Sequence, residues 1–155
     1  IGFDLVGSTL NNKGYSPSKE DYELKLIKMV NEKSLNSVVK FYPFTSERFK
    51  FFEFSFVFLL PADIVFCNYT LLESMSQKIP SIVADVEGSD LIVDQNITGL
   101  IVQRNKYEIA EAIERIYLNK DMQKQMGEKA RQKILRDYNV EKRADRLADI
   151  YNQVK

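Results

Sequence analysis

The hydrophobic and polar positions of this chain alternate between short apolar runs and longer stretches of helical period. The apolar runs, which are typical of strands buried on both faces, fall at residues 1–8, 37–44, 63–66, 81–84 and 100–103. Helical segments separate them and fill the chain after residue 105. This order predicts an α/β fold, with a Rossmann-like parallel sheet, helices on both faces and further helices at the carboxyl end.

Helices are expected at 18–33, from Tyr69 to a break at Ile79-Pro80, and at 90–95, 106–118, 120–138 and 140–154.

The Phe-rich block between residues 41 and 66 fits two different periods. Its Phe residues alternate from 52 to 58 as in a strand, while those at 49, 52 and 56 also share one face of a helix. Periodicity alone does not separate the two. We favour a helix that ends before Pro61 and then a strand at 63–66. The block is interpreted as core, ahead of a surface against another domain or a membrane-contacting patch.

Composition excludes several classes of function. The chain has 155 residues, close to one domain, and is 45% hydrophobic, enough to bury a core. Its 22 basic and 22 acidic residues cancel, which argues against a nucleic-acid partner. There is no His, which removes Ser-His-Asp hydrolysis and most zinc sites. The single Cys67 fits a reducing compartment and is expected to be a small buried hydrophobe.

Neither a membrane-spanning run nor a signal peptide is visible in the sequence. A cytoplasmic location is therefore expected, with membrane association left open. The sequence opens at Ile1, directly in a predicted strand. We expect residues 1–155 to form a single domain that is a piece of a longer two-domain chain.

Ligands of parallel α/β sheets bind at the carboxyl ends of the strands, where loops lead into helices. The candidate loops are residues 7–14, 42–45, 67–72 and 85–89. Glu73 lies near the start of the helix that follows the third of these loops. It could cap the helix, face solvent or contact a ligand.

Residues 62–102 contain several short motifs in a familiar order. They are Ala62-Asp63, Glu73-Ser74-Met75, Ile79-Pro80, the run from Ser81 to Asp85, Glu87-Gly88 and the turn from Asn96 to Leu100. This segment resembles the carboxyl-terminal, donor-binding half of retaining GT-B glycosyltransferases of the family 4, or group 1, type. The resemblance covers about two thirds of the chain and is weaker at both ends.

The resemblance implies roles for particular residues. In the family, the glutamate that matches Glu73 binds the ribose hydroxyls of a nucleotide-sugar, and a carboxylate forms strong hydrogen bonds with such a diol. The helix amino end, from Asn68 through Tyr69, Thr70 and Leu71 to Leu72, would hold the diphosphate.

Two further pairs of residues are candidate substrate contacts by their positions. Gly7 and Ser8 end the first strand, where a glycine could equally serve only a tight turn. Phe44 and Thr45 follow the second strand, where the family passes the nucleobase. An aromatic ring there could stack on a base, but a place in the core is the favoured interpretation.

The sequence also departs from the family. The first acid of the family's two-glutamate motif would fall at Val65, and the glycine-rich loop around it is absent. A non-catalytic, degenerate GT-B module used for binding or assembly is therefore the rival hypothesis. A flavodoxin- or receiver-like domain fits less well, because the acidic cluster that receivers need is missing, and a nucleotide-sugar epimerase stays open.

The function implied by the resemblance is hexose transfer from a UDP- or GDP-sugar to a sugar or lipid-linked acceptor, as in polysaccharide biosynthesis. The expected partners are the nucleotide-sugar, an amino-terminal acceptor domain and a peripheral membrane surface, with no cofactor and no metal. The domain by itself is expected to bind nucleotide weakly and to catalyse little.

Overall fold

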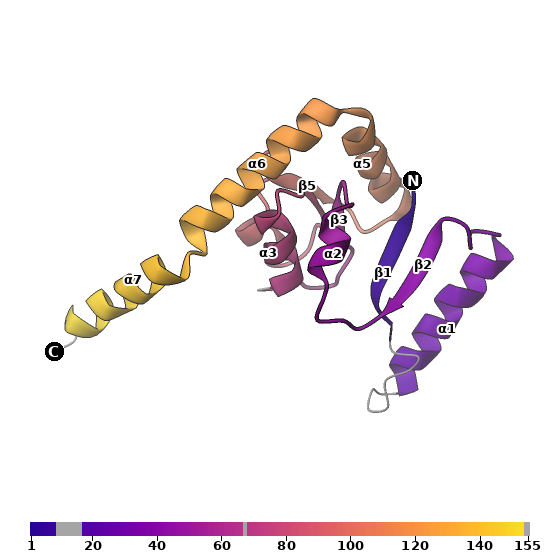
Figure 1. Ribbon diagram of the computed structural model, residues 1–155, viewed down its shortest axis with the longest axis horizontal. Helices are drawn as coiled ribbons and strands as arrows, with labels where there is room; N and C mark the ends of the chain where they lie inside the picture. Colours follow the sequence, from indigo (N-terminus) through magenta and orange to yellow (C-terminus); the bar gives the residue numbers. More distant parts are fainter. Residues whose placement is uncertain (9–16, 67, 154–155) are drawn as a thin grey trace. The chain divides into compact units, whose positions relative to one another are not determined.

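The computed structural model describes residues 1–8, 17–66 and 68–153. The chain divides into two compact units, Ile1–Phe51 (unit 1) and Phe52–Lys155 (unit 2). Figure 1 labels their helices and strands. Within the described residues, none of the helices combines the length and apolar content that crossing a bilayer requires.

Unit 1 is a parallel pair of strands joined through a helix. It contains β1 (Phe3–Ser8), α1 (Pro17–Glu32) and β2 (Val39–Pro43). The two strands pair in parallel from Phe3 opposite Val39 onward, and the register shifts between Val6 and Ser8. Parallel pairing needs a crossover connection, which α1 supplies as predicted. Much of the predicted loop 7–14, like Cys67, lies outside the described residues.

Unit 2 contains a three-stranded parallel sheet in the order β3-β4-β5. Its elements are β3 (Phe58–Leu60), α3 (Tyr69–Ser76), β4 (Ser81–Ala84), α4 (Ser89–Ile92), β5 (Gly99–Val102), α5 (Lys106–Leu118), α6 (Lys120–Asp137) and α7 (Val140–Gln153). The predicted α/β alternation and parallel pairing are confirmed. The strands form two sheets, one in each unit.

The central strand β4 is buried at every residue, which explains its continuous apolar run. Ile82 and Val83 are both fully buried, and because neighbouring side chains of a strand point to opposite faces, they serve two separate cores. Val83 packs with α3 residues and Ala130 of α6. Ile82 packs with α5 residues and Met126 of α6. The sheet of unit 2 is therefore covered on both faces, as predicted.

The prediction for the Phe-rich block is wrong in its elements. The helix there, α2 (Phe49–Phe52), is only one turn long, and the strand is Phe58–Leu60 rather than 63–66. Residues 58–60 pair with β4, and the chain leaves the sheet at Pro61, which has no N–H to continue a ladder. The N–H of Val65 instead donates to the carbonyl of Glu87, 3.1 Å away.

Burial in this block is also mixed. Phe52 is buried and meets Phe58 edge-to-face, with ring centroids 6.4 Å apart. Phe54, by contrast, is 89% exposed. The interpretation of the block as core holds for some of its rings and fails for others.

The carboxyl end of α3 is fixed on α6. Arg131 donates to the carbonyl of Ser76, and Lys78 forms an ion pair with Glu128 at 2.8 Å. The backbones meet at Gly127, where an added Cβ would lie 2.0 Å from the carbonyl oxygen of Lys78. No side chain fits in that space, so a glycine is needed there in the middle of a helix.

We expect Gly127→Ala to destabilise the fold by about 1–3 kcal/mol through overpacking. This would occur although alanine favours helices over glycine by roughly 1 kcal/mol. Urea unfolding measures the change. The exposed α6 variant Gln132→Ala is the control and should stay within about 0.5 kcal/mol of the parent. A stabilised Gly127→Ala protein would contradict the close contact.

Candidate functional site

The first turn of α3 is held by a side-chain cap and by one core residue. Asn68 is extended at the N-cap, and its side-chain oxygen accepts from the N–H of Leu71 at 2.9 Å. The Leu71 side chain is fully buried, while Tyr69 is 77% exposed. The cap and the core contact together fix where the helix begins and how its amino end is oriented.

This geometry reduces the number of backbone N–H groups that could bind the predicted diphosphate. The N–H of Leu71 is taken by Asn68, and that of Leu72 donates to the Asn68 carbonyl at 3.1 Å. The first N–H groups of any helix have no intrahelical acceptor. Tyr69 and Thr70 therefore supply the backbone donors that a ligand could use, where the helix dipole favours an anion.

Glu73 is the fifth residue of α3 and lies in its second turn. Its side chain is partly buried. Because Asn68 caps the helix and α3 has no acidic residue in its first turn, the interpretation of Glu73 as a cap is wrong. A partly buried carboxylate one turn from an anion-favouring helix end suits a ligand with a polar group beside its phosphate.

The loops that follow β3, β4 and β5 are joined by polar contacts at the carboxyl edge of the sheet. Asp63 forms an ion pair with Arg104. Gln103 donates to the Asp85 carboxylate at 2.8 Å. A third contact is the bond from Val65 to Glu87 described above. The three loops therefore form one connected surface beside the start of α3.

Gly88 lets two of these loops come close together. Its φ of +89° is in the left-handed region, and an added Cβ would lie 2.4 Å from the Val65 carbonyl oxygen. The glycine predicted in loop 85–89 thus has a structural role: it permits the turn and the contact with the preceding loop.

Val65 occupies the position where the resemblance places an acid. It is 1% exposed and packs in the core with Leu71, Met75 and Val83. A carboxylate at this position would be buried among apolar side chains, which costs free energy. An apolar residue therefore suits the packing at this point of the chain.

The candidate residues of unit 1 gather at the carboxyl edge of its own sheet. Gly7 adopts φ +109° at the register shift, and Ser8 lies opposite Pro43. Phe44 follows at once and is 70% exposed. The interpretation of Phe44 as core is therefore wrong. The side-chain oxygen of Thr45 accepts from the N–H of Glu47 at 3.0 Å.

Sequence reasoning missed Gln103 and Arg104. They directly follow β5, whose carboxyl end was left out of the candidate loops although the same rule applies to it. Taking in the fifth strand would have found both residues.

A family model described as "Glycosyl transferases group 1" matches residues 3–133. This chain belongs to the group 1 glycosyltransferases. The family match accounts for the order of motifs noted in the sequence, and it agrees with the parallel α/β architecture of both units.

Two curated relatives are similar to this group 1 chain. It is 25% identical over 144 residues to an alpha-D-kanosaminyltransferase of Streptomyces kanamyceticus, covering 91% of this chain and 36% of the relative. It is 29% identical over 96 residues to a UDP-Gal:alpha-D-GlcNAc-diphosphoundecaprenol alpha-1,3-galactosyltransferase of Escherichia coli, covering 61% of this chain and 24% of the relative. The chain thus spans about a third or less of these relatives' length.

Among solved structures, the Anabaena protein Alr3699/HepE, crystallised in complex with UDP, matches with a TM-score of 0.88 at 15% identity. The match covers 99% of this chain and 41% of that protein. The likeness shows that the two share a fold.

We expect Asn68→Ala to cost about 1 kcal/mol of stability, because it removes the side-chain acceptor at the start of α3. Asn68→Asp keeps that acceptor, and its unfolding temperature should be close to that of the parent. Thermal unfolding of the two variants distinguishes them. Equal losses in both would mean that the cap does not stabilise α3.

Proposed function

We propose that this chain is the donor-binding, carboxyl-terminal half of a retaining group 1 glycosyltransferase. The complete protein would transfer a hexose from a UDP- or GDP-sugar to a sugar or lipid-linked acceptor. The relatives support this proposal, since one is named for a UDP-galactose donor and a diphosphoundecaprenol-linked acceptor. The structurally similar Anabaena protein was crystallised with UDP.

The observation that carries the proposal is the arrangement of α3. Its amino end lies at the carboxyl edge of a parallel sheet, where α/β folds bind nucleotides. Its open donors at Tyr69 and Thr70 precede the partly buried Glu73 by about one helical turn. That spacing suits a diphosphate at the helix end with a ribose beside it.

In this mechanism the protein holds the donor and stabilises the departing nucleotide. Glu73 would accept hydrogen bonds from the ribose hydroxyls. The amino end of α3 would interact most strongly with the diphosphate as negative charge accumulates there during departure of the sugar. No cofactor is invoked. The acceptor would come from an amino-terminal domain, so this chain alone should catalyse little.

The rival function is a degenerate module that binds or assembles without catalysis. It is favoured by one observation, the buried Val65 at the position of the family's first acid. A donor site with one carboxylate instead of two makes fewer hydrogen bonds to its ligand. The two hypotheses differ in whether the chain still binds nucleotide.

Calorimetric titration of the chain with UDP, GDP and ADP tests the proposal. We expect saturable binding with a preference for one nucleotide. Glu73→Ala should weaken it by about 1–3 kcal/mol, the usual range for hydrogen bonds to a charged group.

Glu114→Ala, an exposed α5 position, is the matched control and should bind like the parent. No binding by a folded parent chain would favour the degenerate module. Binding that is equal in the parent and in Glu73→Ala would remove Glu73 from the site.

A further inference from the structure

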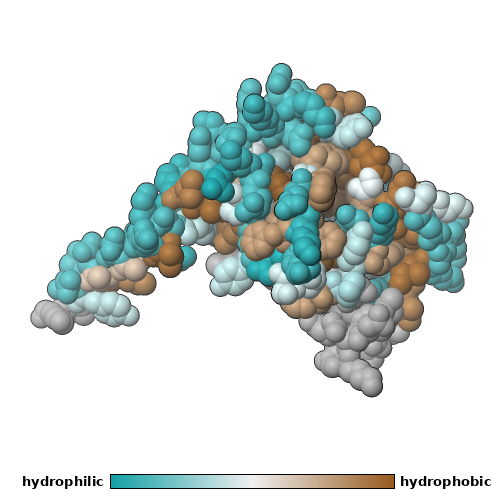
Figure 2. All heavy atoms as spheres, in the orientation of Figure 1, coloured by the Kyte–Doolittle hydropathy of each residue, from teal (hydrophilic) through white to brown (hydrophobic). Residues whose placement is uncertain are grey.

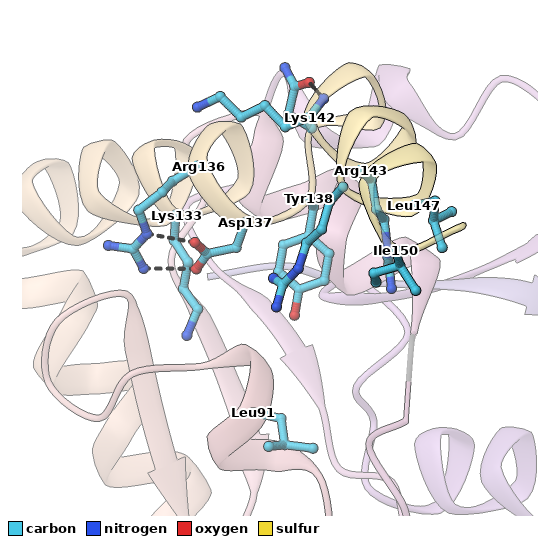
Figure 3. A pocket seen from close by; sticks show the side chains of 11 residues that line it. Leu91, Lys133, Arg136, Asp137, Tyr138, Lys142, Arg143, Leu147 and Ile150 are labelled. Carbon is cyan, nitrogen blue, oxygen red and sulfur yellow. Dashed lines mark hydrogen bonds and ion pairs between the residues drawn. The ribbon is translucent and has the colours of Figure 1, made fainter. Parts of the chain in front are cut away.

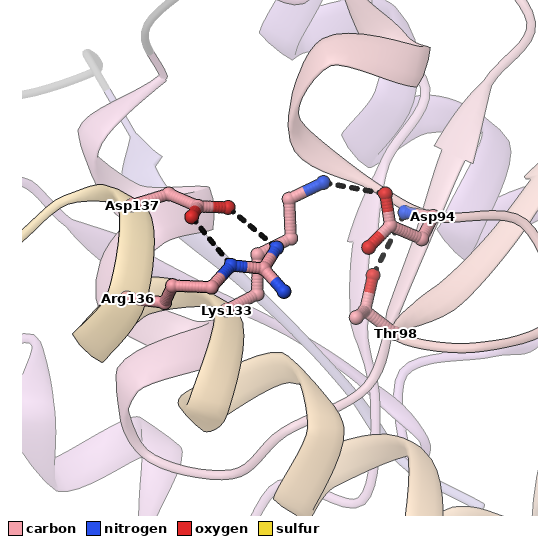
Figure 4. A network of polar contacts seen from close by, with 5 residues as sticks. All are labelled: Asp94, Thr98, Lys133, Arg136 and Asp137. Atoms are coloured by element: carbon pink, nitrogen blue, oxygen red, sulfur yellow. Dashed lines mark hydrogen bonds and ion pairs between the residues drawn. The ribbon is translucent and has the colours of Figure 1, made fainter.

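A groove of about 650 Å³ lies between α6 and α7, and Figure 3 shows side chains that line it. Two of its cations are paired, as Figure 4 shows. Lys133 forms an ion pair with Asp94 at 2.5 Å. Arg136 donates two hydrogen bonds to Asp137, at 2.6 and 2.7 Å. These hydrogen bonds, followed by the charges of Arg136, Lys133 and Lys142, hold the pKa of Asp137 below its ordinary value.

Hydrophobic atoms along one side of α7 also border this groove (Figure 2). Nothing in the described part of the chain shows what covers them. The groove therefore points to no particular ligand.

The loops beside the start of α3 form a better-defined surface. In the proposed donor site the ribose lies at Glu73 and the diphosphate at the amino end of α3, about one turn away. A nucleotide-sugar carries its sugar on the far side of the diphosphate from the ribose. The sugar therefore continues past the helix end, over the loop that precedes α3 and over loop 85–89. These two loops are joined by the hydrogen bond from Val65 to Glu87.

The loop before α3 exposes an aromatic ring at this point. Val65 is 1% exposed, whereas its neighbour Phe66 is 55% exposed. The Phe66 ring lies against the turn of loop 85–89, because its Cδ1 atom is 3.3 Å from the place that a Cβ on Gly88 would occupy. Among the described residues, no other aromatic ring pairs with it. The ring is thus supported by backbone and still has apolar area that a ligand could bury.

The carboxylates of the same loops differ in their partners. Asp63 forms an ion pair with Arg104, which neutralises its charge. Asp85 is exposed, and the neutral amide of Gln103 donates to it at 2.8 Å. One such hydrogen bond orients the carboxylate and leaves its charge and further acceptor positions for a ligand.

The two exposed groups match the two kinds of surface that a hexose has, C–H groups on the faces of its ring and hydroxyls around its edge. We propose, resting on the proposed function, that the transferred sugar packs one ring face on Phe66 while Asp85 accepts hydrogen bonds from its hydroxyls. Gln103 is a positioning residue for Asp85. The site then selects a neutral hexose and disfavours a uronic acid, because a second carboxylate beside Asp85 would be repelled.

Calorimetric titration with UDP, UDP-glucose, UDP-galactose and UDP-glucuronate, and with GDP and GDP-mannose, tests the proposal. At least one neutral hexose conjugate should bind the parent more tightly than its nucleoside diphosphate. Phe66→Ala should reduce this advantage about three- to tenfold, and Asp85→Ala about tenfold, with binding of the nucleoside diphosphate unchanged. Glu73→Ala, by contrast, should weaken both ligands equally.

Two further variants separate direct contact from a structural role. Phe66→Tyr keeps the ring and should keep the advantage of the sugar conjugate. Asp85→Ala should also reduce the preference for UDP-glucose over UDP-glucuronate, because the repulsion is removed. The matched controls are Phe54→Ala, an 89% exposed ring that precedes β3, and Asp145→Ala, an exposed carboxylate of α7. Both should bind every ligand like the parent, and circular dichroism confirms that each variant is folded.

A parent chain that binds nucleoside diphosphate but gains nothing from any sugar would overturn this inference and leave the proposed function standing. Equal weakening of both ligands by Phe66→Ala or Asp85→Ala would overturn it as well, since the residues would then not contact the sugar. Absence of all nucleotide binding by the folded parent would overturn the proposed function and this inference together.

Discussion

The structure of unit 2 depends on one strand that is buried from both sides. β4 has no exposed residue, and its two central side chains, Ile82 and Val83, belong to different cores. Full burial of such a side chain is worth about 1.5–3 kcal/mol. Helices must therefore cover both faces of the sheet to keep these side chains buried. α3 lies on one face and α5 on the other, and α6 contributes to both cores.

That constraint also places the candidate site. Leu71 and Met75 of α3 pack on the core that contains Val83, so the helix cannot slide along the sheet without exposing them. The amino end of α3 is consequently fixed at the carboxyl edge, beside loops tied together through Asp63, Asp85 and Val65. Leu71 and Met75, which pack in the core, lie on the opposite side of this short helix from Glu73, the proposed donor-binding residue. Val65, at the position where the resemblance places an acid, is buried in the same core.

The sequence predicts an element well where its hydrophobic pattern fits only one secondary structure and its neighbours in the fold favour the same one. The apolar run at 81–84 and the helix at 106–118 were found because burial on both faces and a clear amphipathic period leave little choice. The Phe-rich block was misread, because its rings satisfy two periods and the decision comes from pairing with β4, a tertiary contact. For the same reason the exposure of Phe44 could not be predicted, because neighbours distant in sequence decide it.

The sequence identifies the candidate site only in part, and the roles of its residues stay predictions. Glu73 and the start of α3 follow from a helix after a strand and from the family resemblance. The cap at Asn68 and the linkage of Arg104 to Asp63 depend on how loops meet at the edge of the sheet.

The most direct test of the account is a UDP titration of the isotopically labelled chain, followed through its backbone amide resonances. The account predicts that the amides of Tyr69, Thr70 and Glu73 shift first and saturate together, with the loop 85–89 responding at the same concentrations. Saturable shifts confined to other parts of the chain, with α3 unchanged, would contradict the assignment of the donor site to α3.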